Sequence, residues 1–569
     1  MAETPPRRAA QTLADAPESS TRPRNRARAI RFLQWLPAVA LSIAFGIAVG
    51  AAYAHANGGF DAPDDSSNYA TAQALVEDGR PWLDIPAGLT DQNDLLHQRG
   101  FTTRNDRAVP IQPLLTSALH AVFWKPTGSF AVSAGLFAAL ALFGWVFAAS
   151  KVGRLNPLWA TLVPAIAMPL LFWLTRQYFT ASTYLLFLPW SLALAVMAWE
   201  RKSWRLALAA GALHGLALAA RPDFAVAHAL ALPLVAACAW SVGAKMPSRQ
   251  QFAAFAAGFF VLAGPLVLGV NTWLLGSPFK FGYDSANSNP RFAVSPPEPG
   301  IFGLDQVLGR LFPLGVASSS DLIELSSRYL IQMMPWFPIL ACIGLGLFCW
   351  RRRPAAIAGI IVSLGVFAFY VIISHTNREY AGSTTDPPSP ASSMVRYYLP
   401  VIVVMAMFLS AGVSRLLELA KGDLWRTVIA AVLCPSAAFG IWLALFGYDF
   451  VTLFEWSGIS RDNRVAYNEL FGRLEENAFV VTPWFDRYVV LADRQSIAWY
   501  PNELDVTYRP RGLAETLERI DGTGAPVYIV NLGEVTPAFR TELCERSLTL
   551  VGVPGQKSLL RLVRGPVCR

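Results

Sequence analysis

The chain of 569 residues is 54% hydrophobic and only 15% charged, with a mean hydropathy of +0.37 and a net charge of +8. A soluble chain carries roughly a quarter charged residues. This composition therefore excludes a water-soluble enzyme, a disordered chain and a protein that binds nucleic acid through a basic surface patch. It indicates a mainly α-helical protein that crosses a membrane several times, and we expect its basic residues to mark the topology.

The amino-terminal segment 1–32 is rich in Pro, Ala, Arg and Ser and has no apolar face, which predicts a disordered tail. The apolar run that follows is too long for a signal-peptide core, so we expect an uncleaved first span. Runs of about 17–25 apolar residues can cross the hydrocarbon layer as helices. Eleven are predicted, at 33–54, 128–150, 158–175, 179–199, 206–220, 224–243, 252–275, 330–350, 355–374, 397–416 and 427–447.

Lys and Arg residues near the ends of these runs predict the orientation, because cytoplasmic loops carry the excess of positive charge. With the N-terminus inside, the cytoplasmic segments hold 20 Lys and Arg residues in about 70 positions. The outside loops before residue 449 hold 13 in about 150 positions. The sequence thus predicts a cytoplasmic N-terminus and an external C-terminus, periplasmic or extracellular, for a protein of the cytoplasmic membrane.

The predicted transmembrane domain, 33–448, has two long external loops, 55–127 and 276–329, and is followed by a segment of ordinary soluble composition. In that segment, apolar β-type runs alternate with helical stretches. The β-type runs are 478–482, 488–492, 527–530, 548–553 and 559–563, and the helical stretches are 461–476, 512–521 and 536–546. We predict a small external α/β domain at 449–569.

The six cysteines divide along the same boundary. Four fall in or beside predicted spans and are interpreted as small packing residues. Cys544 and Cys568 lie in the external domain, where oxidation is permitted, so they are candidates for a disulfide, with two free thiols as the alternative.

The first external loop places two adjacent carboxylates, Asp64 and Asp65, directly before a predicted helix at 66–78 that ends at Gly79. One interpretation is helix capping, in which a carboxylate accepts hydrogen bonds from the first turn. The other is a base held at the membrane surface to take a proton from an incoming hydroxyl. Paired acids can also hold a divalent metal ion. Pro110 and Pro113 then introduce a second predicted surface helix, with Pro113 in its first turn.

Several basic and aromatic residues stand on the predicted external side, against the usual charge bias. Arg is suited to phosphate oxygens because its guanidinium is a planar fork of donors. The plainer interpretation of each residue is an interfacial anchor or a solvated turn. The candidates for anion binding are Arg221, Lys280, Arg291, Arg396 and Tyr397, with Tyr69 and Tyr283 as supporting residues.

Taken in order, these segments resemble the GT-C superfamily of membrane glycosyltransferases, which use polyprenyl-phosphate sugars. The most similar groups are the protein O-mannosyltransferases (family 39), the aminoarabinose transferases and the RgtA–D-type transferases. Short motifs over about 33–416 carry the resemblance: Asp65-x-x-x-Tyr69 with Ala72 and Leu75, Pro110 with Pro113, Gly211 and Gly215 before Arg221-Pro222-Asp223, Gly276 to Phe279, and Arg396 to Pro400.

The resemblance implies a hexosyl or pentosyl transfer from a polyprenyl-phosphate donor to a lipid, glycan or protein acceptor outside the membrane. It implies an acid of the first loop as general base, which maps onto Asp65 with Asp64 as a second candidate, and basic residues that hold the lipid phosphate. A single displacement would invert the anomeric carbon. Thr180 and Ser182 depart from the pattern, since many relatives carry an acid there, so a second carboxylate stays unassigned.

Two other classes of protein remain as alternatives. A transporter predicts ionisable groups near the bilayer midplane, broken helices and inverted repeats, whereas the charged candidates here cluster at one surface. A catalytically inactive scaffold that acts through its external domain is the third hypothesis.

Overall fold

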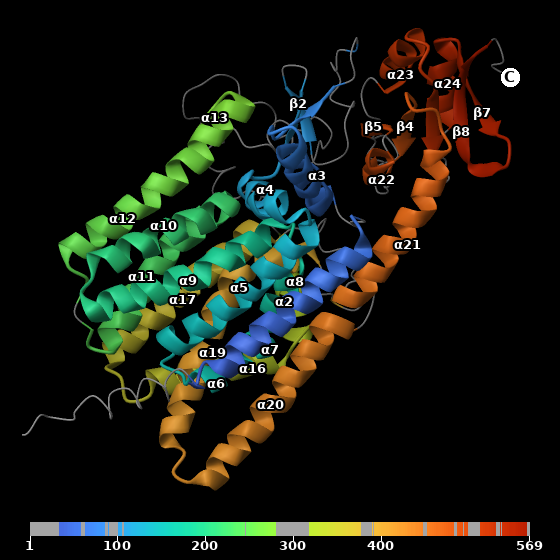
Figure 1. Ribbon diagram of the computed structural model, residues 1–569. Helices are drawn as coiled ribbons and strands as arrows, with labels where there is room; N and C mark the ends of the chain where they lie inside the picture. The colour runs from blue at the N-terminus through green and yellow to red at the C-terminus, as the bar shows by residue number, and fades with distance from the viewer. Residues whose placement is uncertain are drawn as a thin grey trace, which may run out of the picture.

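The computed structural model describes residues 33–565, apart from 59–62, 86–88, 90–100, 105–106, 245, 280–317, 377–387, 389, 391, 448–451, 483–485, 493, 499–512, 531–534 and 536. Long helices run side by side through the body of the molecule (Figure 1). The helices and strands of the first loop and the C-terminal sheet lie at the same end of this bundle. The prediction of a mainly helical bundle with a small C-terminal α/β domain is confirmed.

Among the described residues, eight helices are long and apolar enough to cross a membrane, or ten if each of two bent pairs is one span. The eight are α2 (Leu36–Ala56), α5 (Phe130–Val152), α9 (Thr180–Arg201), η1 with α11 (Pro222–Ser241), α12 to α13 (Arg249–Leu275), α17 (Pro354–His375), α19 (Leu399–Leu419) and α20 (Asp423–Phe446). The predicted span 206–220 corresponds to α10 (Trp204–Ala220), which at 17 residues is a shorter apolar helix.

The two bent pairs differ from the straight spans that the sequence predicts. Helices α6 and α7 (Pro157–Ile166) meet α8 (Met168–Thr175) at 81°, and α15 with η4 (Ser319–Gln332) meets α16 (Trp336–Cys349) at 87°. Pro169 and Pro335 lie at the two breaks. Proline cannot donate the backbone hydrogen bond that would continue the helix across the break. Part of the predicted loop 276–329 is therefore helical.

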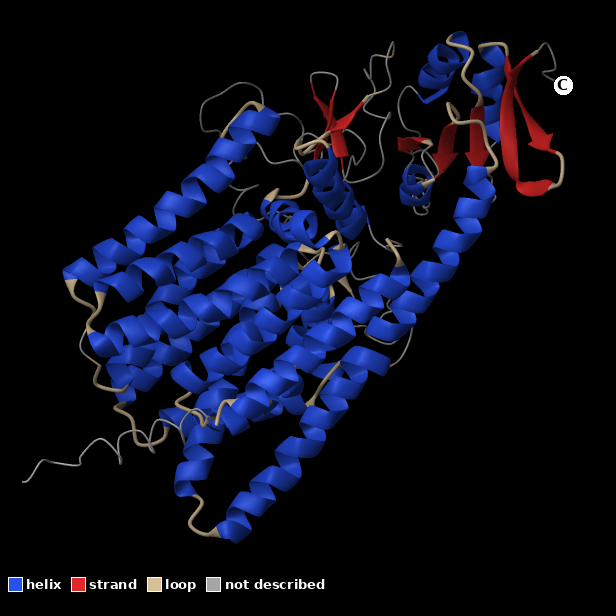
Figure 2. Ribbon diagram, viewed as in Figure 1, coloured by secondary structure: helices blue, strands red, loops and turns tan. Residues whose placement is uncertain are grey.

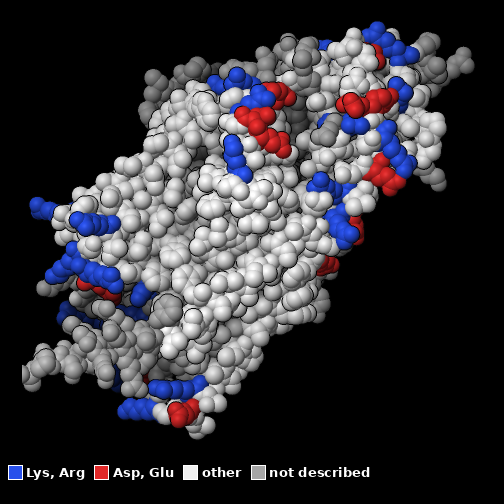
Figure 3. All heavy atoms as spheres, in the orientation of Figure 1, with Lys and Arg blue, Asp and Glu red and all other residues white. Residues whose placement is uncertain are grey.

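Charged side chains gather at the two ends of the bundle on the face shown in Figure 3, and the surface between them carries almost none. Exposed Leu, Ile, Val, Phe and Trp side chains cover this middle zone, and on α12 they include Phe252, Phe260 and Val261. An apolar band of this kind is what a membrane-spanning surface requires.

The first loop folds into two helices and a small sheet (Figure 2). The sequence predicts the helices but not the sheet. Helix α3 (Pro63–Glu77) and helix α4 (Leu115–Thr127) pack together. Strands β1 (Leu83–Asp84), β2 (Phe101–Arg104) and β3 (Arg107–Pro110) form an antiparallel sheet in the order β1-β3-β2. Pro113 precedes α4 by two residues and is not in its first turn, which corrects the prediction.

The C-terminal domain is built around a five-stranded sheet in the order β5-β4-β6-β8-β7. Its elements are β4 (Phe479–Thr482), α22 (Asp486–Leu491), β5 (Gln495–Ala498), α23 (Leu513–Gly522), β6 (Val527–Val530), α24 (Pro537–Glu545), β7 (Leu548–Val553) and β8 (Gln556–Arg564). The run at 488–492 was predicted as a strand, but it is helical, and β5 was not predicted. Helix α21 (Leu453–Gly472) joins this domain to the bundle.

Buried hydrogen bonds hold the two surface helices against the bundle. The Asn68 amide donates to the backbone oxygen of Tyr178 at 2.8 Å and accepts from the Ser117 hydroxyl at 3.0 Å. The His120 ring lies 2.9 Å from both the Ser133 hydroxyl and the backbone oxygen of Gln177. The start of α3 is thereby fixed relative to the turn before α9.

Burial of His120 makes a pH dependence of stability testable. Desolvation lowers the pKa of His120 to about 4, so the folded protein binds this proton less readily than the unfolded chain does. Stability should fall as the pH drops from about 6.5 towards 4, by about 2 kcal/mol at pH 5. Thermal unfolding in detergent at pH 7.5 and 5.0 measures this, and the loss should be smaller in His120→Gln. An equal loss in both proteins would contradict the assignment to His120.

Candidate functional site

A carboxylate of the first loop lies in contact with two polar side chains from distant parts of the chain. Asp64 is at the second position of α3, where Pro63 begins the helix. The Gln112 amide donates to Asp64 Oδ1 at 2.7 Å, and the Arg396 guanidinium forms an ion pair with Asp64 Oδ2. The Asp64 side chain is 21% exposed. It is thus fixed by its partners and still reached by solvent.

The ring of Tyr397 lies close to two guanidinium groups. The Arg396 Cζ is 5.3 Å from the ring centroid, and the Arg221 Cζ is 5.2 Å from it. Tyr397 ends helix α18 (Ser393–Tyr397), whereas Arg221 lies between α10 and η1. Three predicted candidates, Arg221, Arg396 and Tyr397, therefore meet at one place, beside Asp64.

The two arginines differ in how they are held. Arg221 is paired with Asp223, with its Nε 2.9 Å from Oδ1 and its Nη2 2.5 Å from Oδ2, and its Cζ stacks 4.2 Å from the Phe224 ring centroid. Arg396 takes its carboxylate partner from α3 and lies 5.8 Å over Phe179. Burial raises the pKa of Tyr397, so its hydroxyl stays protonated beside these cations. Guanidinium groups in such a partly desolvated place are suited to phosphate oxygens.

The adjacent acid, Asp65, has a different environment. Asp65 is 2% exposed, and it acts electrostatically on the Tyr53 hydroxyl together with Arg176, which is itself buried. Arg176 stacks 4.7 Å from the ring of Trp456 in α21. Asp65 is therefore buried beside the bundle, whereas Asp64 is the carboxylate that solvent can reach. Neither residue is an N-cap, because both lie inside the helix.

The remaining candidates fall into two groups. Tyr69 of α3 packs among aromatic rings, with its centroid 5.2 Å from those of Trp124 and Phe130 and 5.7 Å from that of Tyr178. It therefore helps to hold α3 in place. Lys280, Tyr283 and Arg291 lie outside the described residues.

In the C-terminal domain Cys544 is disulfide-bonded, while its predicted partner Cys568 lies outside the described residues. The four cysteines in or near the spans are free.

Gln112 was missed by the sequence analysis as a site residue. It stands between Pro110 and Pro113, just after β3, and the sequence offers one signal for it, a lone amide between two prolines. A second missed residue is Phe179, which faces Arg396. For a metal ion, no group of three His, Cys, Asp or Glu side chains comes together in the part of the chain that the structure describes.

The hydrogen bond from Gln112 gives a prediction for catalysis. Replacing Gln112 with Leu removes the hydrogen bond that orients Asp64 Oδ1, so kcat for the sugar transfer that the sequence resemblance implies should fall about tenfold. The KM for the sugar-carrying lipid should be unchanged, because Arg221 and Arg396 remain. Steady-state kinetics of Gln112→Leu against Gln73→Leu, a half-buried amide on α3 that donates to Glu77, test this. A raised donor KM with normal kcat would show that Gln112 acts on binding instead.

Comparison with known proteins yields matches only at the level of structure. No family model matches the chain, and no curated protein sequence does. Two solved structures of ArnT from Cupriavidus metallidurans, one bound to undecaprenyl phosphate and one in the apo state, superpose with a TM-score of 0.52 at 14% and 13% identity. Each covers 93% of this chain and 98% of ArnT. Arabinofuranosyltransferase AftD from mycobacteria gives a TM-score of 0.49 at 15% identity, covering 93% of this chain and 41% of AftD.

The likeness to the two ArnT structures defines the fold class of the protein. The chain is a polytopic helical membrane protein with surface helices in its first loop and a small C-terminal α/β domain. It has the fold of ArnT over nearly the whole length of both chains. The likeness to ArnT therefore confirms the predicted fold.

Proposed function

We propose that the protein is a GT-C membrane glycosyltransferase that moves a sugar from a polyprenyl-phosphate donor to an acceptor on the outer side of the cytoplasmic membrane. One observation carries this proposal: a solvent-reached carboxylate, Asp64, lies beside two guanidinium groups, Arg221 and Arg396, that are close to one ring. The ArnT structure bound to undecaprenyl phosphate supports the choice of donor.

In this proposal the leaving group is the lipid phosphate. The acceptor hydroxyl attacks the anomeric carbon, its oxygen forms the new glycosidic bond, and the bond from that carbon to the phosphate oxygen breaks. Asp64 takes the proton of the hydroxyl, and Arg221 and Arg396 stabilise the charge that grows on the departing phosphate. Base and leaving group on opposite faces of the sugar give a single displacement with inversion.

Asp64 is our choice of base over Asp65, which was the residue that matched the family motif. A base must come within hydrogen-bond reach of the proton that it takes. Asp65 is 2% exposed, whereas the Asp64 side chain is 21% exposed. The cationic groups also lie beside Asp64.

The orientation is part of the same proposal. The candidate site lies with the first-loop elements at one end of the bundle, and the basic loops at 151–154, 201–205 and 351–353 lie among the residues predicted to be cytoplasmic. The charge bias of the loops supports an external position for the site.

Purified full-length protein in nanodiscs tests the function. We expect release of undecaprenyl phosphate from at least one undecaprenyl-phosphate-linked hexose or pentose when envelope lipid, glycan or protein is added as acceptor. Catalysed solute flux in proteoliposomes without any sugar transfer would replace the proposal with the transporter hypothesis. Neither activity from folded protein would favour the inactive scaffold.

A further inference from the structure

A segment of the first loop packs into the core of the C-terminal domain. Ile85 directly follows β1, is 8% exposed, and belongs to the same apolar cluster as residues of β4 and β5. These are Phe479, Val481 and Ile497. Leu89 is partly buried and packs against the same cluster. Two side chains from a distant part of the sequence therefore complete the core of this domain.

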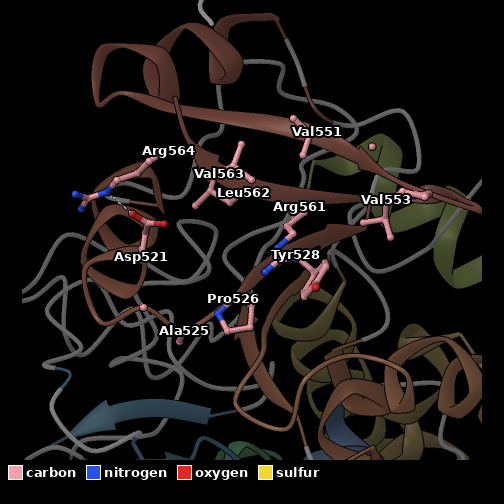
Figure 4. A pocket seen from close by; sticks show the side chains of 13 residues that line it. Asp521, Ala525, Pro526, Tyr528, Val551, Val553, Arg561, Leu562, Val563 and Arg564 are labelled. Carbon is pink, nitrogen blue, oxygen red and sulfur yellow. Dashed lines mark hydrogen bonds and ion pairs between the residues drawn. The ribbon is translucent and has the colours of Figure 1, made fainter. Parts of the chain in front are cut away.

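A hollow on the same domain is built differently. Figure 4 shows Tyr528, Arg561 and the valines of the β7–β8 hairpin around it. Its lining residues all fall within 521–564, so they come from the domain itself. An exposed residue of this hollow can therefore serve as a control for the docked segment of the first loop.

Strand β1 connects the docked segment to the candidate site. It ends one residue before Ile85 and pairs with β3 in antiparallel register, with Leu83 opposite Ala108. Two residues after the end of β3, the Gln112 amide donates to Asp64 Oδ1. A displacement of β1 would therefore be passed through one pair of strands to the hydrogen-bond partner of Asp64.

The first-loop sheet also packs on α3, the helix that carries Asp64. Phe101 and Ala108 form a buried cluster with Ala70 of α3, and Leu83 packs against this cluster. The strands have only two to four residues, and so small a sheet has little stability of its own in water. It keeps its place through the surfaces on which it packs, which are α3 and, through Ile85, the C-terminal domain.

The domain that receives Ile85 is itself anchored to the bundle. Helix α21 joins the two, and Leu491 of α22 packs against both the core of the bundle and a core cluster of the domain. The domain thus offers the first loop a surface that is fixed relative to the transmembrane helices.

We propose that the C-terminal domain positions the candidate base, with Ile85 and Leu89 as the positioning residues. Docking of these two side chains holds β1, β1 holds β3, and β3 places Gln112 against Asp64. The inference rests on the proposed glycosyltransferase function for its effect on sugar transfer, whereas the docking itself needs no catalysis. A charge at position 85 should release the segment, because an unpaired charge is costly in an apolar core.

Ile85→Asp in the full chain in nanodiscs tests the inference. Hydrogen–deuterium exchange should become faster in the segment 107–110, because β3 loses a fixed partner. The kcat should fall by up to about tenfold, the effect expected of losing the Gln112 hydrogen bond. The KM for the sugar-carrying lipid should be unchanged, since Arg221 and Arg396 remain. Ile85→Val keeps an apolar branched side chain and should behave as the wild-type protein.

Val551→Asp is the matched control, because it places the same charge on the same domain. Val551 is 42% exposed and follows Leu550 in β7, so the two side chains point to opposite faces of the sheet. Leu550 packs against the cluster that contains Ile85. Val551→Asp should leave both the exchange of 107–110 and kcat unchanged.

A double variant tests the route through Gln112. Ile85→Asp combined with Gln112→Leu should lower kcat no further than Gln112→Leu alone, because residues that act through one contact are not additive. Additive losses would overturn the inference, and so would unchanged exchange of 107–110 in Ile85→Asp. If Ile85→Asp does not accumulate as folded protein, Ile85→Ala replaces it, with smaller changes in the same direction.

The two proposals fail separately. Faster exchange of 107–110 in Ile85→Asp, from a wild-type protein that transfers no sugar, contradicts the enzyme and leaves the docking intact. Sugar transfer by the wild-type protein, with normal kcat in folded Ile85→Asp, contradicts the positioning role.

Discussion

Asp64→Asn should abolish nearly all sugar transfer, lowering kcat by about 10²–10⁴-fold, which is the usual contribution of a general base. The amide has the size of the carboxylate and can still accept the hydrogen bond from Gln112, so the fold around α3 should be kept. The loss of sugar transfer would then come from the missing base and not from a change in the fold. Undecaprenyl phosphate release, measured at saturating donor and normalised to folded protein, gives the effect.

Two control variants sharpen this result. Asp78→Asn, at an exposed residue just after α3 that pairs with Arg80, should transfer sugar normally. Asp65→Asn should lower the melting temperature. The buried Arg176 nearby would then lose a carboxylate that compensates its charge. Normal transfer by Asp64→Asn, together with inactive but folded Asp65→Asn, would reassign the base to Asp65.

Arg396→Ala should weaken the binding of undecaprenyl phosphate and lower kcat by about 10²–10³-fold, as removal of a group that stabilises developing charge does. Its guanidinium is held by Asp64 at one side and by the Tyr397 and Phe179 rings at others. Arg396→Lys should recover only part of the affinity, since an ammonium group lacks the planar fork. Thermophoresis with labelled undecaprenyl phosphate and the transfer assay measure the two effects.

Arg415→Ala is the matched control for this variant. Arg415 lies near the other end of α19, is paired with Glu418 and is far along the helix from the site. It should bind undecaprenyl phosphate normally. Equal affinity of the wild-type protein and Arg396→Ala would remove Arg396 from the phosphate site and leave Arg221 as the candidate.

The spans were predictable because the requirement of the hydrocarbon layer for about 20 apolar residues is strong and local. The bends at Pro169 and Pro335 were not, since a proline ends or kinks a helix without fixing the angle that follows. The first-loop sheet escaped prediction because its strands have only two to four residues. The apolar run of α22 is as compatible with a buried helix as with a strand.

The site was predictable in part. Arg221 and Arg396, with the adjacent Tyr397, stood out because they place positive charge on the predicted external side, against the usual charge bias. The ion pair of Arg396 with Asp64 joins residues 332 positions apart, which no local pattern encodes. The choice between Asp64 and Asp65 also required the structure, because their burial depends on how α3 packs.

Helix α21 fixes the distance between the C-terminal domain and the helical bundle. Leu453 and Trp456, near its start, are buried in the core of the bundle, and Phe471, near its end, is buried in the domain core. Its 20 residues span about 30 Å as one rigid element. The domain is therefore held at a fixed distance from the bundle. If an acceptor contacted both the domain and the transfer site, that distance would determine which of its hydroxyl groups reaches the site.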